Sequence, residues 1–351
     1  MPKATLFDKA FAIDHTFIIA EIGVNHNGSM DLARQLIDAA VGTGADAVKF
    51  QIFRTEELVT VTAEKADYQK ATTGTEETHQ WAMLKALELN QAQHRELFDY
   101  CAAAGITYVC TPYDTESARF LAEDLAVAAI KVASSDTTNI PFLEALDAMG
   151  RPVILSTGMC TIDEVRAAVA AMPLSRASGQ LCLLQCTSEY PAPADQSNLR
   201  VMGTMKAEFG CPVGFSDHTV GTDVATLAVA AGAVIIEKHF TLDRRLPGPD
   251  HRASSDPAEF TDLVARIRQV EAILGSYNKV VTEAESGNKQ MMQKSIYWRR
   301  AVGAGEVVSE ADLVYKRPAL GLRPADSQQV LGRVLTRAVE PDQLVRWDDL
   351  V

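Results

Sequence analysis

Lysines stand inside two short apolar segments of this sequence, at Lys49 and Lys131. A lysine in a buried strand costs stability unless its ammonium group meets an anion. Hydroxyl side chains end other segments of the same kind, namely Thr111, Ser134, Ser156 and Ser216. One such lysine would fit a surface or salt-bridged position equally well. Two lysines beside several hydroxyls favour a small phosphorylated or carboxylated ligand.

Two histidines, His218 and His239, end consecutive apolar segments. If these segments are neighbouring strands, the two imidazoles lie close together, and Glu237 points the same way as His239 because strand side chains alternate faces. Such a pair suits a divalent transition metal that keeps positions open for substrate or water. A single histidine would more often be a core or hydrogen-bonding residue, so the metal prediction depends on the pair.

The segments that carry these side chains alternate with helical patterns. Eight apolar, β-branched segments predict strands at residues 17–22, 47–51, 107–111, 129–133, 153–156, 181–187, 213–216 and 234–240. Helical periodicity lies between them, for example at residues 29–43, 91–104, 162–171 and 222–231. Eight such units predict an α/β fold, a TIM (β/α)8 barrel over residues 1–276, in preference to a doubly wound open sheet. The polar strand ends would then meet at the catalytic face of the barrel.

Two connections at that face stand out. The segment 54–90 is long and polar, and it is either a lid over the catalytic face or a disordered surface insertion. The segment 244–256 follows the last predicted strand and contains Asp250. A general base, a hydroxyl ligand and a turn-stabilising residue are all open interpretations of this aspartate.

The pattern changes near residue 283. Short β segments at residues 301–308, 312–315, 316–323 and 332–339 are separated by glycine and proline. We therefore predict a linker at residues 277–293 and a small β-rich domain at residues 294–351. A domain of this size is expected to dock on the barrel or on a second subunit.

Composition narrows the class of protein. The 351 residues are 47% hydrophobic and 23% charged, which is ordinary for a globular protein. The formal net charge of -13 argues against a nucleic-acid-binding surface. We see no signal peptide and no apolar run long enough for a membrane helix. Six scattered cysteines without a CxxC pair favour buried thiols. Together these features predict a cytoplasmic protein that binds neither nucleic acid nor membrane.

Several segments of the chain resemble the N-acetylneuraminate (sialic acid) synthase family. They are, in order, AEIGVNHNG at 20–28, AVKFQ at 47–51, STGM at 156–159, QCTSEYP at 185–191, GFSDHT at 214–219 and EKHFT at 237–241. The C-terminal region, with Lys316-Arg317-Pro318 and Gly332-Arg333, resembles the antifreeze-like (SAF) domain of that family. The resemblance covers both predicted domains.

This resemblance implies a transferase that joins phosphoenolpyruvate to an N-acylated amino-sugar aldehyde with the help of Mn2+ or Mg2+. In the family, the enol carbon attacks the aldehyde, water adds at the pyruvyl C2, and phosphate leaves by C–O cleavage. The products are neuraminic, legionaminic and pseudaminic acids. The residues do not rank the sugars securely, and N-acetylmannosamine is slightly favoured over a diacetamido-trideoxyhexose.

The resemblance also implies roles for individual residues. His218 and His239 match the metal ligands of the family. The positions that bind phosphoenolpyruvate are Lys49, Thr111, Lys131, Ser134, Ser156, Ser188 and Ser216. The positions near the sugar are Gln51, Asp136, Tyr190, Asp250 and Arg317. Catalytic roles fall to Glu21, Lys49, Lys131 and Asp250, with Glu21 expected in proton transfer.

Arg317 matches an arginine that the SAF domain inserts into the barrel of the partner subunit, against the N-acyl group. The resemblance therefore implies a domain-swapped homodimer. Three positions depart from the family pattern: Asp136 stands where some members have glutamate, Ser135 replaces a common glycine, and Ser188 stands where some relatives have asparagine. All three lie at or beside the substrate and bear on sugar identity more than on reaction type.

Two other functions remain open at this point. Another phosphoenolpyruvate-dependent keto-sugar-acid synthase would act on phosphorylated sugars and would need an additional basic site, and such enzymes lack a SAF domain. A non-catalytic carbohydrate-binding protein would have no need for two lysines and two histidines at strand ends.

Overall fold

The computed structural model of the protein describes residues 15–73 and 79–351. The chain forms two compact units, Met1–Gly275 and Ser276–Val351. Residues 1–14, to which the expected absence of a signal peptide refers, and residues 74–78, within the long connection, lie outside the described residues. Within the described part of the chain, no helix is both long enough and apolar enough to span a membrane.

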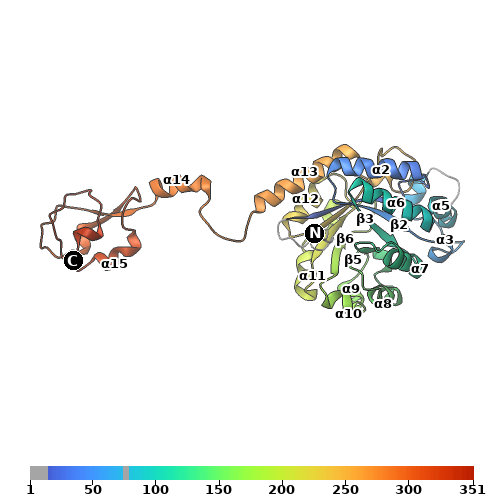
Figure 1. The fold of residues 1–351 in the computed structure, drawn as a ribbon, viewed down its shortest axis with the longest axis horizontal. Coiled ribbons are helices and arrows are strands. Elements are labelled where there is room, and N and C mark those ends of the chain that lie inside the picture. The colour runs from blue at the N-terminus through green and yellow to red at the C-terminus, as the bar shows by residue number, and fades with distance from the viewer. Residues whose placement is uncertain (1–14, 74–78) are drawn as a thin grey trace. The chain divides into compact units, whose positions relative to one another are not determined.

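Eight parallel strands form a closed barrel in the first unit (Figure 1). They are β1 (Phe17–Gly23), β2 (Ala47–Ile52), β3 (Thr107–Pro112), β4 (Ile130–Val132), β5 (Val153–Ser156), β6 (Leu181–Cys186), β7 (Val213–Asp217) and β8 (Ile235–His239). Strand β1 pairs with both β2 and β8, which closes the barrel and sets Glu21 opposite Lys49 on one side and His239 on the other. The predicted TIM barrel is confirmed, and the bounds of every strand agree with its predicted segment to within one residue.

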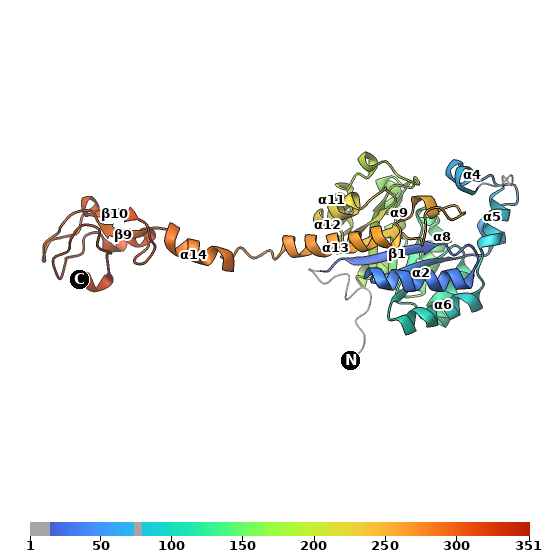
Figure 2. The same cartoon turned by 90° about the horizontal axis from the view of Figure 1, so that it is seen from above.

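Helices surround the barrel (Figures 1 and 2). They are α2 (Met30–Thr43), α6 (Gln91–Ala104), α7 (Thr115–Arg119), α8 (Ile140–Ala148), α9 (Ile162–Ala170), α10 (Pro173–Ala177), α11 (Val201–Phe209), α12 (Asp223–Ala230) and α13 (Pro257–Leu274). Local signals set their ends. Ser29 caps α2, and Asn90 with Gln93 forms a capping box at the start of α6.

The barrel interior is apolar in one half and polar in the other. Phe17, Ile19, Ala47, Val109 and Ile235 belong to a buried cluster that fills the half at the strand starts. Residues two positions further along the same strands share the inward face, because strand side chains alternate. Those next inward positions include Glu21 on β1, Lys49 on β2 and Glu237 on β8. The polar residues therefore lie above an apolar floor, at the C-terminal ends of the strands.

The long connection after β2 contains three short helices, α3 (Thr55–Leu58), α4 (Asp67–Thr73) and α5 (Gln80–Leu87). Two contacts fix α5. The Glu88 carboxylate accepts hydrogen bonds from the backbone N–H and the hydroxyl of Thr55, at 2.9 and 2.6 Å. The Ala86 carbonyl lies so close to Gly28 that a Cβ on Gly28 would stand 2.6 Å from it. The described part of this connection is therefore an ordered insertion that packs on the barrel.

The second unit has its own small core. It contains α14 (Glu283–Met292), β9 (Ser295–Trp298), β10 (Leu313–Lys316) and α15 (Ser327–Val330), and β9 pairs antiparallel with β10. Trp298, Val302 and Val339 belong to its buried cluster. Four details differ from expectation. Helix α14 occupies much of the predicted linker, and β9 was not predicted. Of the predicted segment 316–323, only Lys316 belongs to a strand, and the predicted strands at 301–308 and 332–339 form isolated bridges such as Val302 with Val339.

Candidate active site

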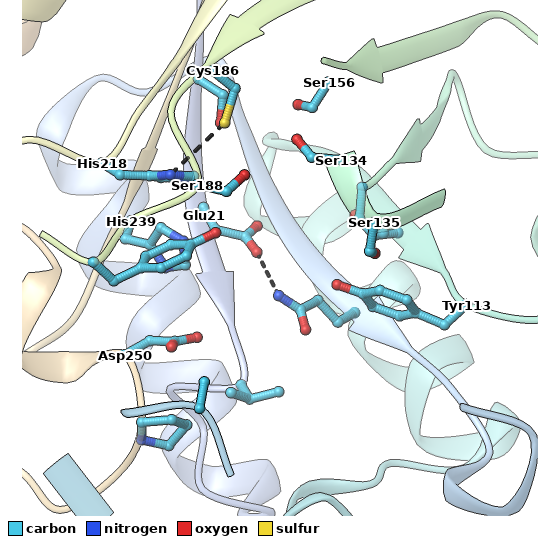
Figure 3. Close-up of a pocket in the computed structure, with 18 of the residues that line it drawn as sticks. Glu21, Tyr113, Ser134, Ser135, Ser156, Cys186, Ser188, His218, His239 and Asp250 are labelled. Atoms are coloured by element: carbon cyan, nitrogen blue, oxygen red, sulfur yellow. Dashed lines mark hydrogen bonds between the residues drawn. The ribbon is translucent and has the colours of Figure 1, made fainter. Parts of the chain in front are cut away.

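A cavity of about 680 Å³ opens at the C-terminal end of the barrel (Figure 3). Thirteen predicted site residues line it, from all eight strands or the segments that follow them: Glu21, Lys49, Gln51, Thr111, Lys131, Ser134, Ser156, Ser188, Tyr190, Ser216, His218, His239 and Asp250. The inward alternation predicted for Lys49 with Gln51, and for Ser216 with His218, explains how strand residues far apart in the chain converge here.

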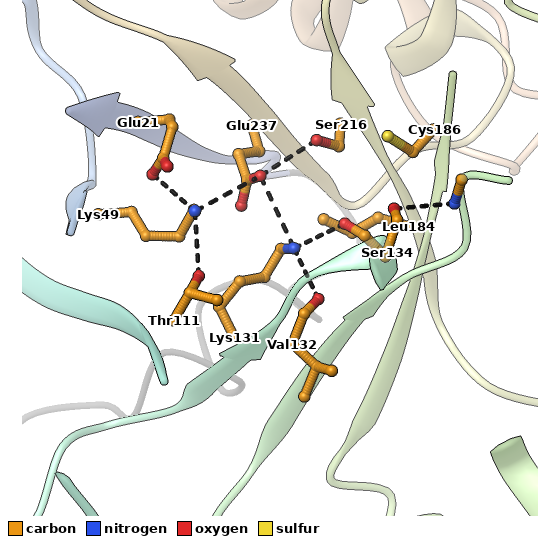
Figure 4. Close-up of polar contacts among 12 residues, drawn as sticks. Glu21, Lys49, Thr111, Lys131, Val132, Ser134, Leu184, Cys186, Ser216 and Glu237 are labelled. Atoms are coloured by element: carbon orange, nitrogen blue, oxygen red, sulfur yellow. Dashed lines mark hydrogen bonds and ion pairs between the residues drawn. The ribbon is translucent and has the colours of Figure 1, made fainter. Parts of the chain in front are cut away.

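The two lysine ammonium groups lie at the floor of the cavity, and each is already paired (Figure 4). Lys49 Nζ lies 2.6 Å from Glu21 Oε2 and donates to the Thr111 hydroxyl at 3.2 Å. Lys131 Nζ donates to Ser156 Oγ at 2.6 Å and to its neighbouring backbone carbonyl at 2.9 Å. Both side chains are almost fully buried. The floor therefore holds two cations and several hydroxyl groups within reach of one small anion.

Glu237 lies between the two lysines. Its Oε1 is 3.9 Å from Lys49 Nζ and 3.8 Å from Lys131 Nζ, and it accepts a hydrogen bond from Ser216 at 3.1 Å. Burial alone would raise the pKa of Glu237, but Lys131 and then Lys49 outweigh it and hold the pKa below its ordinary value. Glu237 is therefore an anion that both lysines share in the free protein.

Burial and neighbouring charges shift the pKa values of the other charged groups at the floor in different directions. Burial lowers the pKa of Lys131, although Glu237 partly offsets this. For Lys49, burial acts in the same direction, but Glu21 and Glu237 outweigh it and raise the pKa. Burial raises the pKa of Glu21 in spite of its contact with Lys49. Groups with opposing shifts in one cavity are typical of sites that move protons.

The serine hydroxyls gather beside Lys131. Ser134 Oγ accepts a hydrogen bond from the backbone N–H of Gly158 at 2.9 Å. A Cβ on Gly158 would collide with the Ser188 hydroxyl and stand 2.9 Å from Ser134 Oγ. Glycine at this position therefore leaves room for the hydroxyls to stand together with a backbone N–H, which is an arrangement suited to an oxyanion.

The two histidines are neighbours at one side of the cavity. The ring centroids of His218 and His239 are 5.5 Å apart, and the Tyr190 ring lies 4.2 Å from that of His218. His218 Nδ1 contacts the Thr187 carbonyl oxygen at 2.8 Å, so Nδ1 carries a proton, and Nε2 has a free lone pair when the ring is neutral. His239 Nδ1 is buried without a hydrogen-bond partner. Burial, and next the proximity of His218, hold the pKa of His239 well below its ordinary value.

These two imidazoles fit a divalent metal. Neutral imidazoles with one nitrogen available are common metal ligands. A buried nitrogen without a hydrogen-bond partner, such as that of His239, is consistent with a bound ion. Among the described residues, no group of three or more His, Cys, Asp and Glu is arranged to hold a metal ion. A metal here would therefore take two ligands from the protein and the others from substrate or water.

Asp250 approaches the cavity from the segment after β8. Burial raises the pKa of Asp250 to about 6, and the negative charge of Glu21 adds to the effect. The short 3₁₀ turn His251–Ala253 follows it, and Ser254 donates to the Asp250 carbonyl at 2.7 Å. The backbone of this aspartate is thus fixed by its own turn, while its carboxyl group faces the cavity (Figure 3).

Two predicted sugar-binding residues have other surroundings in the structure. Asp136 ends a short 3₁₀ turn, Ser134–Asp136, and its carboxylate accepts a hydrogen bond from Asn139 at 3.1 Å. Arg317 belongs to the second unit, where it is exposed and contacts the Met292 sulfur at 3.6 Å. Roles for these two residues in sugar binding stay predictions.

Other lining residues received no role from the sequence. Glu237 was expected to share a face with His239, but its place between two lysines depends on the barrel closing. Cys186 Sγ lies 3.8 Å from His218 Nδ1. A further group is apolar and comes from the ends of β1 and from the insertion: Val24, Leu58, Met83, Leu84 and Leu87. The spacing of residues 80, 83, 84 and 87 is that of one helix face, which could have indicated this group.

Comparison with known proteins gives consistent matches along the chain. The model of the NeuB family matches residues 36–279, and the model of the SAF domain matches residues 293–351. The chain is similar to an N,N'-diacetyllegionaminic acid synthase of Legionella pneumophila, with 43% identity over 95% of this chain and 94% of the relative. A Campylobacter jejuni protein of the same name is 40% identical, over 94% of this chain and 99% of the relative.

A solved structure is also similar. The N-acetylneuraminic acid (sialic acid) synthetase of Leptospira borgpetersenii serovar Hardjo-bovis, in complex with citrate, has a TM-score of 0.69 and 33% identity. The match covers 78% of this chain and 90% of that one.

Proposed function

This chain belongs to the NeuB family and carries a SAF domain, and we propose that the sugar its barrel joins to phosphoenolpyruvate is a diacetamido-trideoxyhexose. The reaction class is condensation with an N-acylated amino-sugar aldehyde, which gives a nonulosonic acid and phosphate. The observation that supports this reaction class is the pair of buried ammonium groups beside a pair of buried imidazoles at one barrel mouth. The choice of sugar has a separate basis.

Phosphoenolpyruvate carries a phosphate and a carboxylate, and both need cationic or hydroxyl partners when they leave water. Lys49, Lys131 and the hydroxyls beside them offer such partners. Glu237 and Glu21 balance the lysine charges when the site is empty of anions. Bound phosphoenolpyruvate would compete with these carboxylates for the same ammonium groups.

The chemistry requires a new carbon–carbon bond and the movement of protons. The CH2 carbon of phosphoenolpyruvate attacks the aldehyde carbon, and the aldehyde oxygen takes a proton. Water then adds at C2 and loses a proton, and the C2–O bond to phosphate breaks, which leaves the keto acid. Glu21 and Asp250 line the cavity, and burial raises the pKa of both, so each can hold a proton near neutral pH more readily than an exposed carboxyl group.

His218 and His239 would hold Mn2+ or Mg2+, which would polarise the aldehyde and help to position water. The position of His218 Nδ1 against a carbonyl, which leaves Nε2 as the nitrogen for a metal, and the unpartnered nitrogen of His239 support this part of the proposal. The hydrogen bond between His218 and the Thr187 carbonyl would keep the first ring in the correct tautomer.

The choice of sugar rests on the relatives. Two proteins named as N,N'-diacetyllegionaminic acid synthases are 43% and 40% identical to the chain. The structure named as a sialic acid synthetase is 33% identical. This order reverses the slight preference for N-acetylmannosamine that the sequence motifs gave, and it favours a sugar with two acetamido groups.

We also propose the domain-swapped homodimer that the family resemblance implies. In it, the exposed Arg317 of one subunit would contact the N-acyl group of a sugar in the barrel of the partner. The cytoplasmic location expected from composition likewise stays a prediction.

Phosphate release from phosphoenolpyruvate tests the reaction and the sugar together. With Mn2+ present, we expect release with a 2,4-diacetamido-2,4,6-trideoxyhexose, much slower release with N-acetylmannosamine, and none after chelation. Faster release with N-acetylmannosamine would overturn the sugar assignment. No release with any acylated amino sugar would overturn the proposed reaction in this chain.

A further inference from the structure

The cavity changes character from its floor to its rim. Along β2 and into α3, the lining side chains are Lys49, then Gln51, then Leu58. Along β1, Glu21 is followed by Val24. Because all strands of the barrel point the same way, later residues in each segment lie nearer the mouth. On the side of β1 and β2, the cavity therefore passes from charged groups at the floor, through an amide, to hydrocarbon at the rim.

The rim on the side of β1 and β2 is one continuous apolar surface. We call Val24, Leu58, Met83, Leu84 and Leu87 the apolar wall. Its members pack together with Phe53 in a cluster that is separate from the main core. Val24 and Leu87 are buried, whereas Leu58, Met83 and Leu84 keep part of their surface exposed in the cavity. Hydrocarbon left exposed in a binding cavity is favourable only when a ligand covers it.

The wall is held in place rather than loosely attached. Met83, Leu84 and Leu87 lie on one face of α5, because positions three and four apart share a helix face. The contacts of Glu88 with Thr55 and of Lys85 with Glu56, the latter at 3.0 Å, tie α5 to α3. The Thr72 hydroxyl donates to the Pro249 carbonyl at 3.1 Å and links α4 to the segment that carries Asp250. A fixed wall can discriminate between ligands by shape and polarity.

The polar groups that the insertion contributes to the cavity are few and uncharged. Among the described residues of the insertion, those that line the cavity are Leu58, Ala66, Gln69, Gln80, Met83, Leu84 and Leu87. Gln80 Nε2 donates to Gln69 Oε1 at 3.3 Å. Side-chain amides can both donate to and accept from an acetamido group, whose methyl group then needs an apolar neighbour. None of these lining residues could neutralise a phosphate on the sugar.

We infer that the apolar wall selects the distal end of the sugar, favouring a C6 methyl group and an acetamido substituent over hydroxyl or phosphate groups. The inference rests on the proposed function, since it assumes that phosphoenolpyruvate occupies the charged floor. The aldehyde carbon must then lie near the floor, beside Glu21 and the two histidines. The other end of the sugar chain points to the rim, where hydroxyl groups would lose water without gaining partners.

Three sugars separate the possibilities. They are the 2,4-diacetamido-2,4,6-trideoxyhexose, its analogue with a C6 hydroxyl group, and the 6-phosphate of that analogue. For the full-length protein with Mn2+, we expect kcat/KM to fall about tenfold from the first to the second, as for a hydroxyl group forced into an apolar pocket. We expect no measurable turnover of the third.

Variants of the apolar wall test whether it causes this preference among the three sugars. In Leu84→Gln, the preference for the C6 methyl group should fall below about threefold, mainly through KM for the sugar, with KM for phosphoenolpyruvate unchanged. Met83→Gln should act in the same direction and serves if Leu84→Gln is unstable. Val61→Gln is the matched control, because Val61 is 68% exposed in the same insertion and does not line the cavity.

The outcomes are distinct. Turnover without preference between the first two sugars, or an unchanged preference in both wall variants, would overturn the wall as the selecting surface while leaving the proposed reaction intact. Absence of phosphate release with all three sugars would overturn the reaction, and this inference with it. A preference that falls in the wall variants and persists in Val61→Gln would support it.

Discussion

Glu237 Oε1, on β8, lies 3.8 Å from Lys131 Nζ, on β4. These two strands stand opposite each other in the closed barrel. The same oxygen is 3.9 Å from Lys49 Nζ. One buried carboxylate thus serves two buried ammonium groups across the interior of the barrel. Removing it would leave two cations close together in a low-dielectric site, where each disfavours the charged form of the other.

Glu237→Gln is therefore expected to move the alkaline limb of the activity profile to lower pH. Burial already lowers the pKa of Lys131, and Glu237 is the group that chiefly opposes this effect. Without the carboxylate, Lys131 would lose its proton at lower pH and bind anions less well. The measurement is kcat/KM for phosphoenolpyruvate against pH. Ser216→Ala, which removes only one hydrogen bond to Glu237, should leave the limb in place; equal shifts in both variants would contradict the explanation.

The two imidazoles carry the metal prediction. His239→Ala is expected to reduce Mn2+ affinity and metal-dependent turnover by about 100-fold or more, because only two protein ligands are available. Calorimetric titration of the protein with Mn2+ gives the affinity without reliance on activity. His15→Ala, at a partly exposed histidine paired with Asp46, should retain wild-type binding. Unchanged Mn2+ affinity in His239→Ala would remove this histidine from the ligand set.

Asp250 should make the stability of the metal-free protein depend on pH. Its pKa is raised from 3.8 to about 6, so the folded protein holds this proton over a pH range in which the unfolded chain has lost it. Its contribution is fully present below pH 3.8 and is lost as the pH rises through about 6. The difference between these two pKa values corresponds to a change of at most about 3 kcal/mol in the free energy of unfolding.

Asp250→Asn removes this dependence. The free energy of unfolding at pH 7.5, measured with urea, should exceed that of the wild-type protein by up to about 3 kcal/mol, and the difference should shrink toward pH 4. The exposed Asp195→Asn is the control, with the same change of charge and no expected gain. A gain that is independent of pH would show that burial of the Asp250 carboxylate is not its cause.

Arg317 tests the proposed exchange of SAF domains. Arg317→Ala should raise KM for the sugar more than KM for phosphoenolpyruvate. If the arginine acts in the partner's barrel, co-expression of Arg317→Ala with His239→Ala should restore about one quarter of wild-type activity, since half the dimers are mixed and each has one intact site. Activity no higher than the sum of the two separate variants would mean that Arg317 does not act across subunits.

Much of the barrel could be predicted from the sequence because each strand is short and apolar and is followed by a helical pattern, in several cases with a capping residue at its start. Helix α6, for example, has the predicted bounds, and its capping box at Asn90 and Gln93 is local in sequence. The convergence of Lys49, Ser216 and His239 followed from strand alternation once a barrel was assumed. These are properties that a single segment determines, or that symmetry of the fold supplies.

Other features depend on contacts between distant segments and could not be read locally. The pairing of Glu237 with two lysines needs three strands to close around one axis. The strand pattern likewise did not indicate that Asp136 lies in a 3₁₀ turn and that its carboxylate accepts a hydrogen bond from Asn139. The segment 54–90 was interpreted from its overall polarity, which masked the apolar face of α5 and the anchoring of Ala86 beside Gly28.

The central claim is that this barrel couples phosphoenolpyruvate to an amino sugar with cleavage of the C–O bond. Phosphoenolpyruvate labelled with oxygen-18 at the bridging position tests this most directly, with the diacetamido sugar, Mn2+ and mass analysis of both products. We expect one nonulosonic acid per phosphate released, with the label in the phosphate. Label retained in the keto acid, or phosphate released without a new keto acid, would contradict it.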